Sequence, residues 1–353
     1  GDGNGDLKGL QSKLDYIKKL GATSILLSPI QSSIYYHNYF ADDFEIIDPE
    51  FGTKQDFLDL VRDAHRHGLR LYMDMETQYV TDQHPWWKEG VDHPDSKYRN
   101  FLLYEDAAHH HPASIMYGEH AFTGYDGVSR QLATVNLRSP EVLDYNVKLF
   151  SDFVDPNHDG RFDDGVDGFR LDHAMDTLDG KKELGDLFAR FWKPLVTRVK
   201  KVNPAITFIA EQANWLDYGT AYYTKAGVDH VFAFGIRFAM ITMDKTEISK
   251  HIHETLAQTP PGKQQIVFLE NHDVSRFASN MGGHKDAIKA GAAVEMLIGQ
   301  VPSIYYGQEL GMTGINRHFN DTDANDIPVR EAFEWNASDS GPGMALWYKG
   351  TGI

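Results

Sequence analysis

Residues 166–173, VDGFRLDH, combine a short strand pattern with charged side chains at its carboxyl end. Apolar and small residues lead to Leu171, and Asp172 follows at once. Arg170 lies two residues before Asp172, so on a strand both side chains share one face. A charged group next to a buried strand costs free energy unless it is paired or has a function. The stretch therefore predicts a buried parallel strand that ends in a polar site.

The same pattern recurs on both sides of this stretch. Short β-rich runs alternate with segments of helical periodicity, for example residues 57–66, 184–202 and 286–298. Regular alternation of strand and helix predicts parallel strands joined by right-handed crossovers. We expect strands at residues 22–29, 69–75, 166–171, 206–210, 231–234, 266–269 and 303–306.

Seven strands in a chain of 353 residues fit a (β/α)8 TIM barrel. The first element is a helical pattern, with apolar residues recurring between Leu7 and Leu20. A closed barrel would therefore have its first strand before Gly1, and this chain alone would leave an unpaired sheet edge that promotes aggregation. An open, doubly wound parallel sheet is the structural alternative.

One segment interrupts the alternation. Residues 81–139 are rich in aromatic, His and Gly residues and show little periodicity. Such a segment is too long for a plain loop. We therefore expect an inserted small domain at 81–139, after the third strand of a barrel formed by residues 1–80 and 140–353.

Composition and charge narrow the classes of function. The formal net charge of -17 argues against nucleic acid as a partner, because phosphates would be repelled. No apolar run approaches the roughly 20 residues needed to cross a bilayer, so we expect no membrane insertion. The absence of cysteine excludes disulfides, thiolate metal sites and cysteine nucleophiles. We expect no organic cofactor.

Polar residues follow four of the predicted strands. They are Asp74 in YMDMETQY, Arg170 and Asp172 in GFRLDH, Glu211 in IAEQ, and His272 and Asp273 in ENHD. In a (β/α)8 barrel these ends converge on the C-terminal face, where such enzymes place catalytic groups.

Carboxylates at these ends suit the hydrolysis of a glycosidic bond. One carboxylate attacks the anomeric carbon, and another, kept protonated, protonates the leaving oxygen. A guanidinium at Arg170 would keep Asp172 ionised. Taken singly, an Asp at a strand end is more often a helix cap, and Arg170–Asp172 or His272 is more often structural. Their co-occurrence at four strand ends favours a site.

At these residues the sequence resembles glycoside hydrolase family 13, the α-amylase family. The motifs that carry the resemblance are GFRLDH (168–173), IAEQ (209–212), ENHD (270–273), the Asp74 strand, GDLKGL (5–10), DPEFGT (48–53) and YYGQELG (305–311). They cover nearly the whole chain in the family's order. The resemblance implies that the inserted segment is the family's domain B.

The resemblance also implies roles for individual residues. It makes Asp172 the nucleophile, Glu211 the general acid/base and Asp273 the carboxylate that binds sugar hydroxyls. Arg170 and His272 would contact the sugar in the cleaved subsite, and Asp74 would support Arg170. Tyr39 would stack on that sugar, and Arg330 resembles an arginine of α-glucosidases that follows the eighth strand.

Two departures from the family pattern affect the predicted specificity. Gln78 and Tyr79 stand where the first conserved region usually ends in Asn-His, and we expect both to line the subsite, with Tyr79 as a hydrogen-bond donor to the sugar. Met175 and Asp176 replace the Lys-His of typical endo-acting α-amylases. These changes favour an oligosaccharide-active member over a starch α-amylase.

Calcium is the metal that the sequence suggests. Asp2, Asn4 and Asp6 resemble the second half of an Asp-rich calcium loop of oligosaccharide-active members. A second run, DPNHDG at 155–160, spaces oxygen ligands like the start of an EF-hand loop, with Val166 in place of the final Glu. The alternative for this run is a solvated acidic turn.

The sequence thus predicts a retaining hydrolase of α-1,4- or α-1,6-linked gluco-oligosaccharides or starch-like α-glucans. The alternatives are a transglycosidase or isomerase of the trehalose synthase or sucrose isomerase type, and a non-catalytic binding domain. We expect a periplasmic or secreted location, although no signal peptide is visible, and the oligomeric state stays open.

Overall fold

The computed structural model describes residues 5–317, 322–336 and 343–345, and it divides into two compact units. The N-terminal unit comprises Asp6–Ala213 and Thr224–Val228. The C-terminal unit comprises Asn214–Tyr223 and Asp229–Ile353, together with Gly1–Gly5. Within the described residues, no helix combines the length and the apolar character that a membrane crossing requires.

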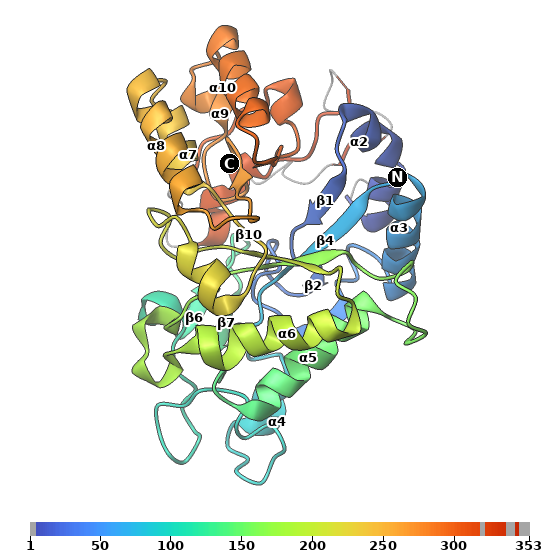
Figure 1. Cartoon of the computed structure of the whole chain (residues 1–353). Coiled ribbons are helices and arrows are strands. Elements are labelled where there is room, and N and C mark those ends of the chain that lie inside the picture. Colours follow the sequence, from blue (N-terminus) through green and yellow to red (C-terminus); the bar gives the residue numbers. More distant parts are fainter. Residues whose placement is uncertain (1–4, 318–321, 337–342, 346–353) are drawn as a thin grey trace. The chain divides into compact units, whose positions relative to one another are not determined.

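A parallel sheet forms the centre of the N-terminal unit. Its strands follow one another in the order β1 (Ser24–Leu27), β4 (Arg70–Met75), β8 (Gly168–Leu171) and β9 (Thr207–Ala210) (Figure 1). The register places Asp74 opposite Arg170, and Leu171 opposite Ala210. Three predicted strand ends therefore lie at one edge of the sheet. The pairing confirms the parallel strands expected from the sequence.

Glycine at the start of β8 is required by close packing. A Cβ atom on Gly168 would lie 2.3 Å from the ring of Tyr72 on β4 and 2.4 Å from the carbonyl oxygen of Thr207 on β9. Any side chain here would push the neighbouring strands apart. Gly168, the first residue of GFRLDH, therefore allows β4, β8 and β9 to pack closely together where they hold the polar site.

Amphipathic helices accompany the sheet. Helix α3 begins with a capping box between Thr53 and Asp56 and buries Phe57 and Leu60 on its apolar face. Helices α5 and α6 pack against each other (Figure 1). The helices and helical turns of the unit are α1 (Leu7–Gln11), α2 (Leu14–Leu20), α3 (Lys54–Arg66), α4 (Pro85–Gly90), η1 (Met116–Gly118), α5 (Pro140–Val154), η2 (Leu178–Gly180), η3 (Lys182–Leu184), the π-helical η4 (Phe188–Trp192) and α6 (Lys193–Val202). A further π-helical turn, η5, spans Tyr222–Ala226.

The segment between β4 and α5 has its own antiparallel sheet. Its strand order is β5 (Tyr79–Thr81), β7 (Ser129–Thr134) and β6 (Ala121–Thr123). Trp86 of α4 is buried, and its ring lies 4.8 Å from that of Phe101. A short antiparallel pair, β2 (Gln31–Ser32) and β3 (Asp43–Ile47), precedes α3. The segment predicted as an insert therefore has strands and a buried aromatic cluster.

The C-terminal unit contains shorter strands and more helix. Strand β11 (Ile266–Val267) pairs in parallel with β12 (Val301–Pro302). Its core includes Ile236, Val267 and Phe277, all with 1% exposure or less. The remaining elements are β10 (His230–Val231), α7 (Phe234–Met240), α8 (Lys245–Gln258), α9 (Phe277–Asn280), α10 (Lys285–Leu297), η6 (Gln308–Leu310) and η7 (Asp323–Val329).

Three sequence-based boundaries are wrong in this unit. The strand expected at residues 266–269 is shorter, because β11 ends at Val267. The strand expected at residues 303–306 lies earlier, at Val301–Pro302, because the last ladder bond, from Ser303 N to Val267 O at 2.8 Å, is followed by a turn. The strand expected at residues 231–234 ends at Val231, and Phe234 already begins α7.

Candidate active site

Arg170 joins three carboxylates at the ends of β4, β8 and β9. Its Nη1 donates to both oxygens of Asp74, at 2.9 and 2.8 Å, and contacts Asp172. Its Nη2 lies 2.8 Å from Oε2 of Glu211. All four residues are at most 5% exposed. The strand register brings these side chains together because Asp74 and Arg170 are cross-strand neighbours and Glu211 directly follows β9.

The charge of Arg170 determines the state of Asp172. Burial opposes ionisation, but the Arg170 guanidinium and then His173 lower the pKa of Asp172 well below its usual value. Asp172 is therefore an anion near neutral pH, as a nucleophile must be.

Tyr39 extends this network. Its hydroxyl donates to Oδ2 of Asp74 at 2.7 Å and accepts from Nη1 of Arg170 at 3.3 Å. The Arg170 guanidinium lies 5.8 Å from the centre of the Tyr39 ring. The structure thus places Tyr39 beside the cluster where the sequence expected a substrate-binding tyrosine.

Gln78 and Tyr79 are buried and bonded to other parts of the protein. Gln78 is fully buried, and its Nε2 donates to the backbone carbonyl oxygen of Asp172. Tyr79 is also fully buried, and its hydroxyl donates to Oδ1 of Asp179 at 2.8 Å. Contact of either side chain with a sugar stays a prediction. Gln78 instead holds the backbone of Asp172.

Two further ionisable residues, Glu76 and His173, belong to this cluster and were not predicted from the sequence. Glu76 follows Asp74 by two residues and is 5% exposed. His173 follows Asp172 directly, and its Nδ1 lies 3.2 Å from Oδ2 of Asp172. The spacing of Glu76 from Asp74, which puts both on one face of the strand end, is the signal that could have identified it.

Asp273, His272 and Arg330 meet in the C-terminal unit. His272 Nε2 lies 3.2 Å from Oδ2 of Asp273, and Arg330 Nη2 lies 3.1 Å from Oδ1 of Asp273. Arg330 Nε also donates to the carbonyl oxygen of His272 at 2.8 Å, and Asp326 pairs with Arg330. The three residues predicted from ENHD and from the loop beyond it form one charged group. The convergence of Asp273 with Asp172 and Glu211 stays a prediction.

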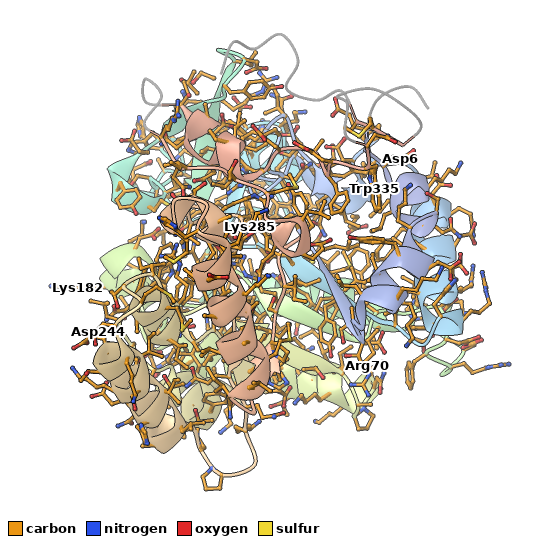
Figure 2. All side chains as sticks on the ribbon, turned by 90° about the horizontal axis from the view of Figure 1, so that it is seen from above. Asp6, Arg70, Lys182, Asp244, Lys285 and Trp335 are labelled. Carbon is orange, nitrogen blue, oxygen red and sulfur yellow. The ribbon has the colours of Figure 1, made fainter. Side chains whose placement is uncertain are left out.

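Of the three predicted calcium ligands near the start of the chain, Asp6 is among the described residues. Asp2 and Asn4 lie outside the described residues. Asp6, labelled in Figure 2, caps α1 and accepts from Gly9 N at 2.5 Å. In the run 155–160, Asp155 accepts backbone N–H groups of Asp159 and Gly160, so the loop satisfies its own carboxylate. This arrangement is the one expected of an acidic turn, the alternative to a calcium loop.

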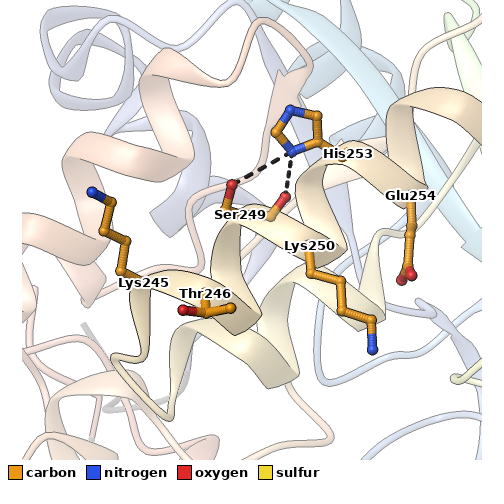
Figure 3. Close-up of a pocket in the computed structure, with 6 residues that line it drawn as sticks. All are labelled: Lys245, Thr246, Ser249, Lys250, His253 and Glu254. Carbon is orange, nitrogen blue, oxygen red and sulfur yellow. Dashed lines mark hydrogen bonds between the residues drawn. The ribbon is translucent and has the colours of Figure 1, made fainter.

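A surface hollow on α8 has no link to the predicted site residues. Its volume is about 680 Å³, and none of the predicted residues lines it. Figure 3 shows that its six lining side chains come from one helix, where His253 is bonded to Ser249. The lining residues are Lys245, Thr246, Ser249, Lys250, His253 and Glu254.

Known proteins resemble this chain over nearly its whole length. Alpha-amylase 3 from Dictyoglomus thermophilum is 26% identical over 354 residues, which cover 98% of this chain and 66% of that relative. A 4-alpha-glucanotransferase from Thermotoga neapolitana is 26% identical, covering 98% of this chain and 75% of that protein. Trehalose synthase/amylase TreS from Mycolicibacterium smegmatis is 30% identical, with coverage of 89% and 61%. The chain thus spans about 60 to 75% of these relatives.

A solved structure and a family model agree with these relatives. The crystal structure of alpha-amylase from H.orenii matches with a TM-score of 0.80 and 25% identity, covering 99% of this chain and 72% of that one. This likeness supports the TIM-barrel fold class. The model of the alpha amylase catalytic domain matches residues 1–348. The chain therefore belongs to the α-amylase family, glycoside hydrolase family 13, through its catalytic domain.

Proposed function

We propose that the protein is a retaining glycoside hydrolase that cleaves α-glucosidic bonds in gluco-oligosaccharides. The observation that carries the proposal is the shared guanidinium of Arg170, which contacts Asp172 through Nη1 and Glu211 through Nη2. Because the carboxyl groups of Asp172 and Glu211 contact the same guanidinium, they lie close together. Retaining enzymes need a short separation of about 5 to 5.5 Å, whereas inverting enzymes leave room for a water molecule.

The reaction proceeds in two displacements. A carboxylate oxygen of Asp172 attacks the anomeric carbon, and the glycosidic C–O bond breaks as the acid form of Glu211 protonates the leaving oxygen. Glu211, now a carboxylate, then takes a proton from water, whose oxygen attacks the same carbon and breaks the ester to Asp172. Both inversions together return the α-configuration.

The remaining predicted residues complete the proposed site. Asp273, with His272 and Arg330 beside it, binds hydroxyls of the sugar in the cleaved subsite, and Tyr39 stacks on that sugar. We assign the closed barrel to residues 1–80 and 140–353, and the role of domain B to residues 81–139. The strands β5, β6 and β7 and the buried Trp86 support a separately packed segment there.

Transfer to another sugar is the second candidate function. The resemblance to a 4-alpha-glucanotransferase and to a trehalose synthase/amylase favours it specifically. The same Asp172 ester serves both reactions, because only the attacking group, water or a sugar hydroxyl, differs.

Product analysis tests the proposal. Wild type and Asp172→Asn are incubated with maltotriose, isomaltose, sucrose and starch, with and without maltose as acceptor. Chromatography follows the products, and proton NMR follows the anomeric configuration. We expect α-anomeric sugar from wild type and no turnover by the mutant. Longer or isomerised products would favour transfer, and an initial β-anomer would contradict retention.

A further inference from the structure

Glu76, Asp172 and His173 form an ionisable triplet in which one side-chain oxygen or nitrogen of each residue lies within 4.8 Å of the others; Glu76 and Asp172 are buried and His173 is half-buried. Asp172 has a role in the mechanism proposed above. Glu76 and His173 have none, although both lie beside the nucleophile. Groups that contact a nucleophile on its buried side influence its charge and its direction.

Glu76 is held in place as a neutral acid. Its Oε1 accepts from the backbone N of Gln78 at 2.6 Å, and a carboxyl oxygen of Glu76 lies within 4.8 Å of one of Asp172. Two carboxylates in contact cannot both be ionised in a buried site. Because Arg170 keeps Asp172 ionised, we assign the shared proton to Glu76, whose acid form can donate to the facing carboxylate of Asp172. Burial and then the charge of Asp172 raise the pKa of Glu76 well above its usual value.

His173 contacts both proposed catalytic carboxyls. Its Nδ1 lies 3.2 Å from Oδ2 of Asp172, and its backbone N donates to Oε2 of Glu211 at 3.4 Å. Its φ angle is 41°, in the left-handed region that few non-glycine residues adopt. Such backbone conformations gather at functional sites, where the surrounding structure enforces them. Burial opposes the imidazolium, but the charge of Asp172 raises the pKa of His173 to about 9.

We propose that Glu76 and His173 are positioning residues for Asp172, with the carboxylic acid and the imidazolium fixing its orientation and holding it ionised. This inference rests on the proposed function, since it assigns the two residues to the same nucleophile. When Asp172 becomes an ester it loses its charge, so both neighbours lose a favourable partner in the intermediate. The pair therefore favours the ionised nucleophile before attack and its regeneration after hydrolysis.

Other charged and titratable groups face this pair and contribute to its titration. They come from the ends of β4, β8 and β9 and from β5, and they are Asp74, Tyr79, Arg170, Asp172 and Glu211. The variants below leave all of them unchanged except where Asp172 itself is the probe.

The first test compares pH profiles of kcat/KM, whose acid limb reports the ionisation of the nucleophile in free enzyme. His173→Gln removes the cation, so we expect this limb to move up by about 1 to 3 pH units. Glu76→Val removes the donor and is expected to lower kcat by roughly 10- to 100-fold with little change in KM. Glu76→Gln keeps a neutral donor and should restore most of that loss. An acid limb at the wild-type pH in His173→Gln would overturn the proposal.

His110→Gln provides the matched control. His110 also pairs with an aspartate, Asp92, but both side chains are more than half exposed. We expect its pH profile to coincide with that of wild type.

The second test does not depend on any substrate. The His173 ring signal, assigned by its loss in His173→Gln, is titrated by NMR in wild type and in Asp172→Asn. We expect a pKa near 9 in wild type and a fall of about 1 to 3 units in Asp172→Asn, because the facing charge is removed. Equal pKa values in both proteins would overturn the inference even if the enzyme cleaves α-glucosides. If no glucoside is cleaved, the fall would support the pairing while the proposed function fails.

Discussion

Arg170 is the residue around which the N-terminal half of the candidate site is organised. It is 2% exposed and contacts Asp74, Asp172 and Glu211. One guanidinium carries a single positive charge and cannot neutralise three carboxylates. At least one of the three carboxyl groups can therefore change its protonation state. This excess of negative charge suits a site where one carboxyl must carry a proton and another must not.

Replacement of Glu211 by Gln separates its acid role from its base role. We expect the variant to lose about 100- to 10,000-fold in kcat on unactivated glucosides, because the leaving oxygen is no longer protonated. On an α-glucosyl fluoride the first step needs little protonation, so that step should remain fast and the ester should accumulate. Stopped-flow measurement of fluoride release would show a burst. Equal losses on both substrates would contradict the acid role.

At Gln78 and Tyr79 the structure shows contacts that the sequence could not predict. The sequence placed Gln78 and Tyr79 at the correct strand end, but it could not show that Tyr79 bonds to Asp179, 100 residues further along the chain. The direction of a side chain at a strand end depends on such distant partners. By contrast, Asp172 and Glu211 were predictable because each directly follows a recognisable strand.

At the scale of the elements, charged groups after parallel strands and glycine at close contacts explain most of the architecture. The alternation of strand and helix located β1, β4, β8, β9, α3 and α10 within a few residues. It failed at residues 303–306, where tertiary pairing rather than local propensity sets the strand. The pattern Leu7–Leu20 also split into α1 and α2, since apolar spacing alone does not reveal a turn at residues 12–13.

Helix α10 contains a buried carboxyl group, that of Glu295, whose contribution to the stability of the protein depends on pH. Glu295 is 1% exposed and accepts from Nε2 of Gln308 in η6 at 2.6 Å. Burial raises the pKa of Glu295 to about 8. The folded state therefore binds a proton that the unfolded state has lost above its ordinary pKa of 4.5. The contribution of Glu295 to stability is therefore fully present below pH 4.5 and declines as the pH rises to about 8.

Glu295→Gln should remove this decline. We expect wild type and variant to have similar Tm values near pH 4.5, with the variant gaining about 1 to 3 kcal/mol in relative stability by about pH 9. Calorimetry or circular dichroism across this range provides the comparison. A constant difference in Tm at every pH would show that Glu295 does not titrate as described.

At the scale of the whole molecule, the family match covers residues 1–348 and so includes almost the entire chain. Of the sheet that holds the proposed nucleophile, β1 is an end strand, and its Leu26 is 41% exposed. An exposed apolar strand edge promotes association between copies of a chain. The order of the family motifs along the chain, and not the hydrophobic pattern, is the reason that residues of both units were predicted to form one site.

Leu26→Lys tests the consequence of this edge for the 353-residue chain. We expect a larger soluble, monodisperse fraction on size-exclusion chromatography, because charge at a strand edge opposes edge-to-edge pairing. Leu297→Lys is the control, since Leu297 is 82% exposed but belongs to a helix. An equal gain in both variants would point to general surface hydrophobicity instead of the edge of β1.

Capture of the covalent intermediate tests the proposed nucleophile most directly. A 5-fluoro-α-glucosyl fluoride has a good leaving group and slows hydrolysis of the ester, so the glucosyl group should remain on the enzyme. Peptide mass spectrometry of the labelled full-length protein should then locate one fluoroglucosyl group on Asp172, and Asp172→Asn should stay unlabelled. A label on another carboxylate, or an active enzyme that never carries one, would contradict a double displacement through Asp172.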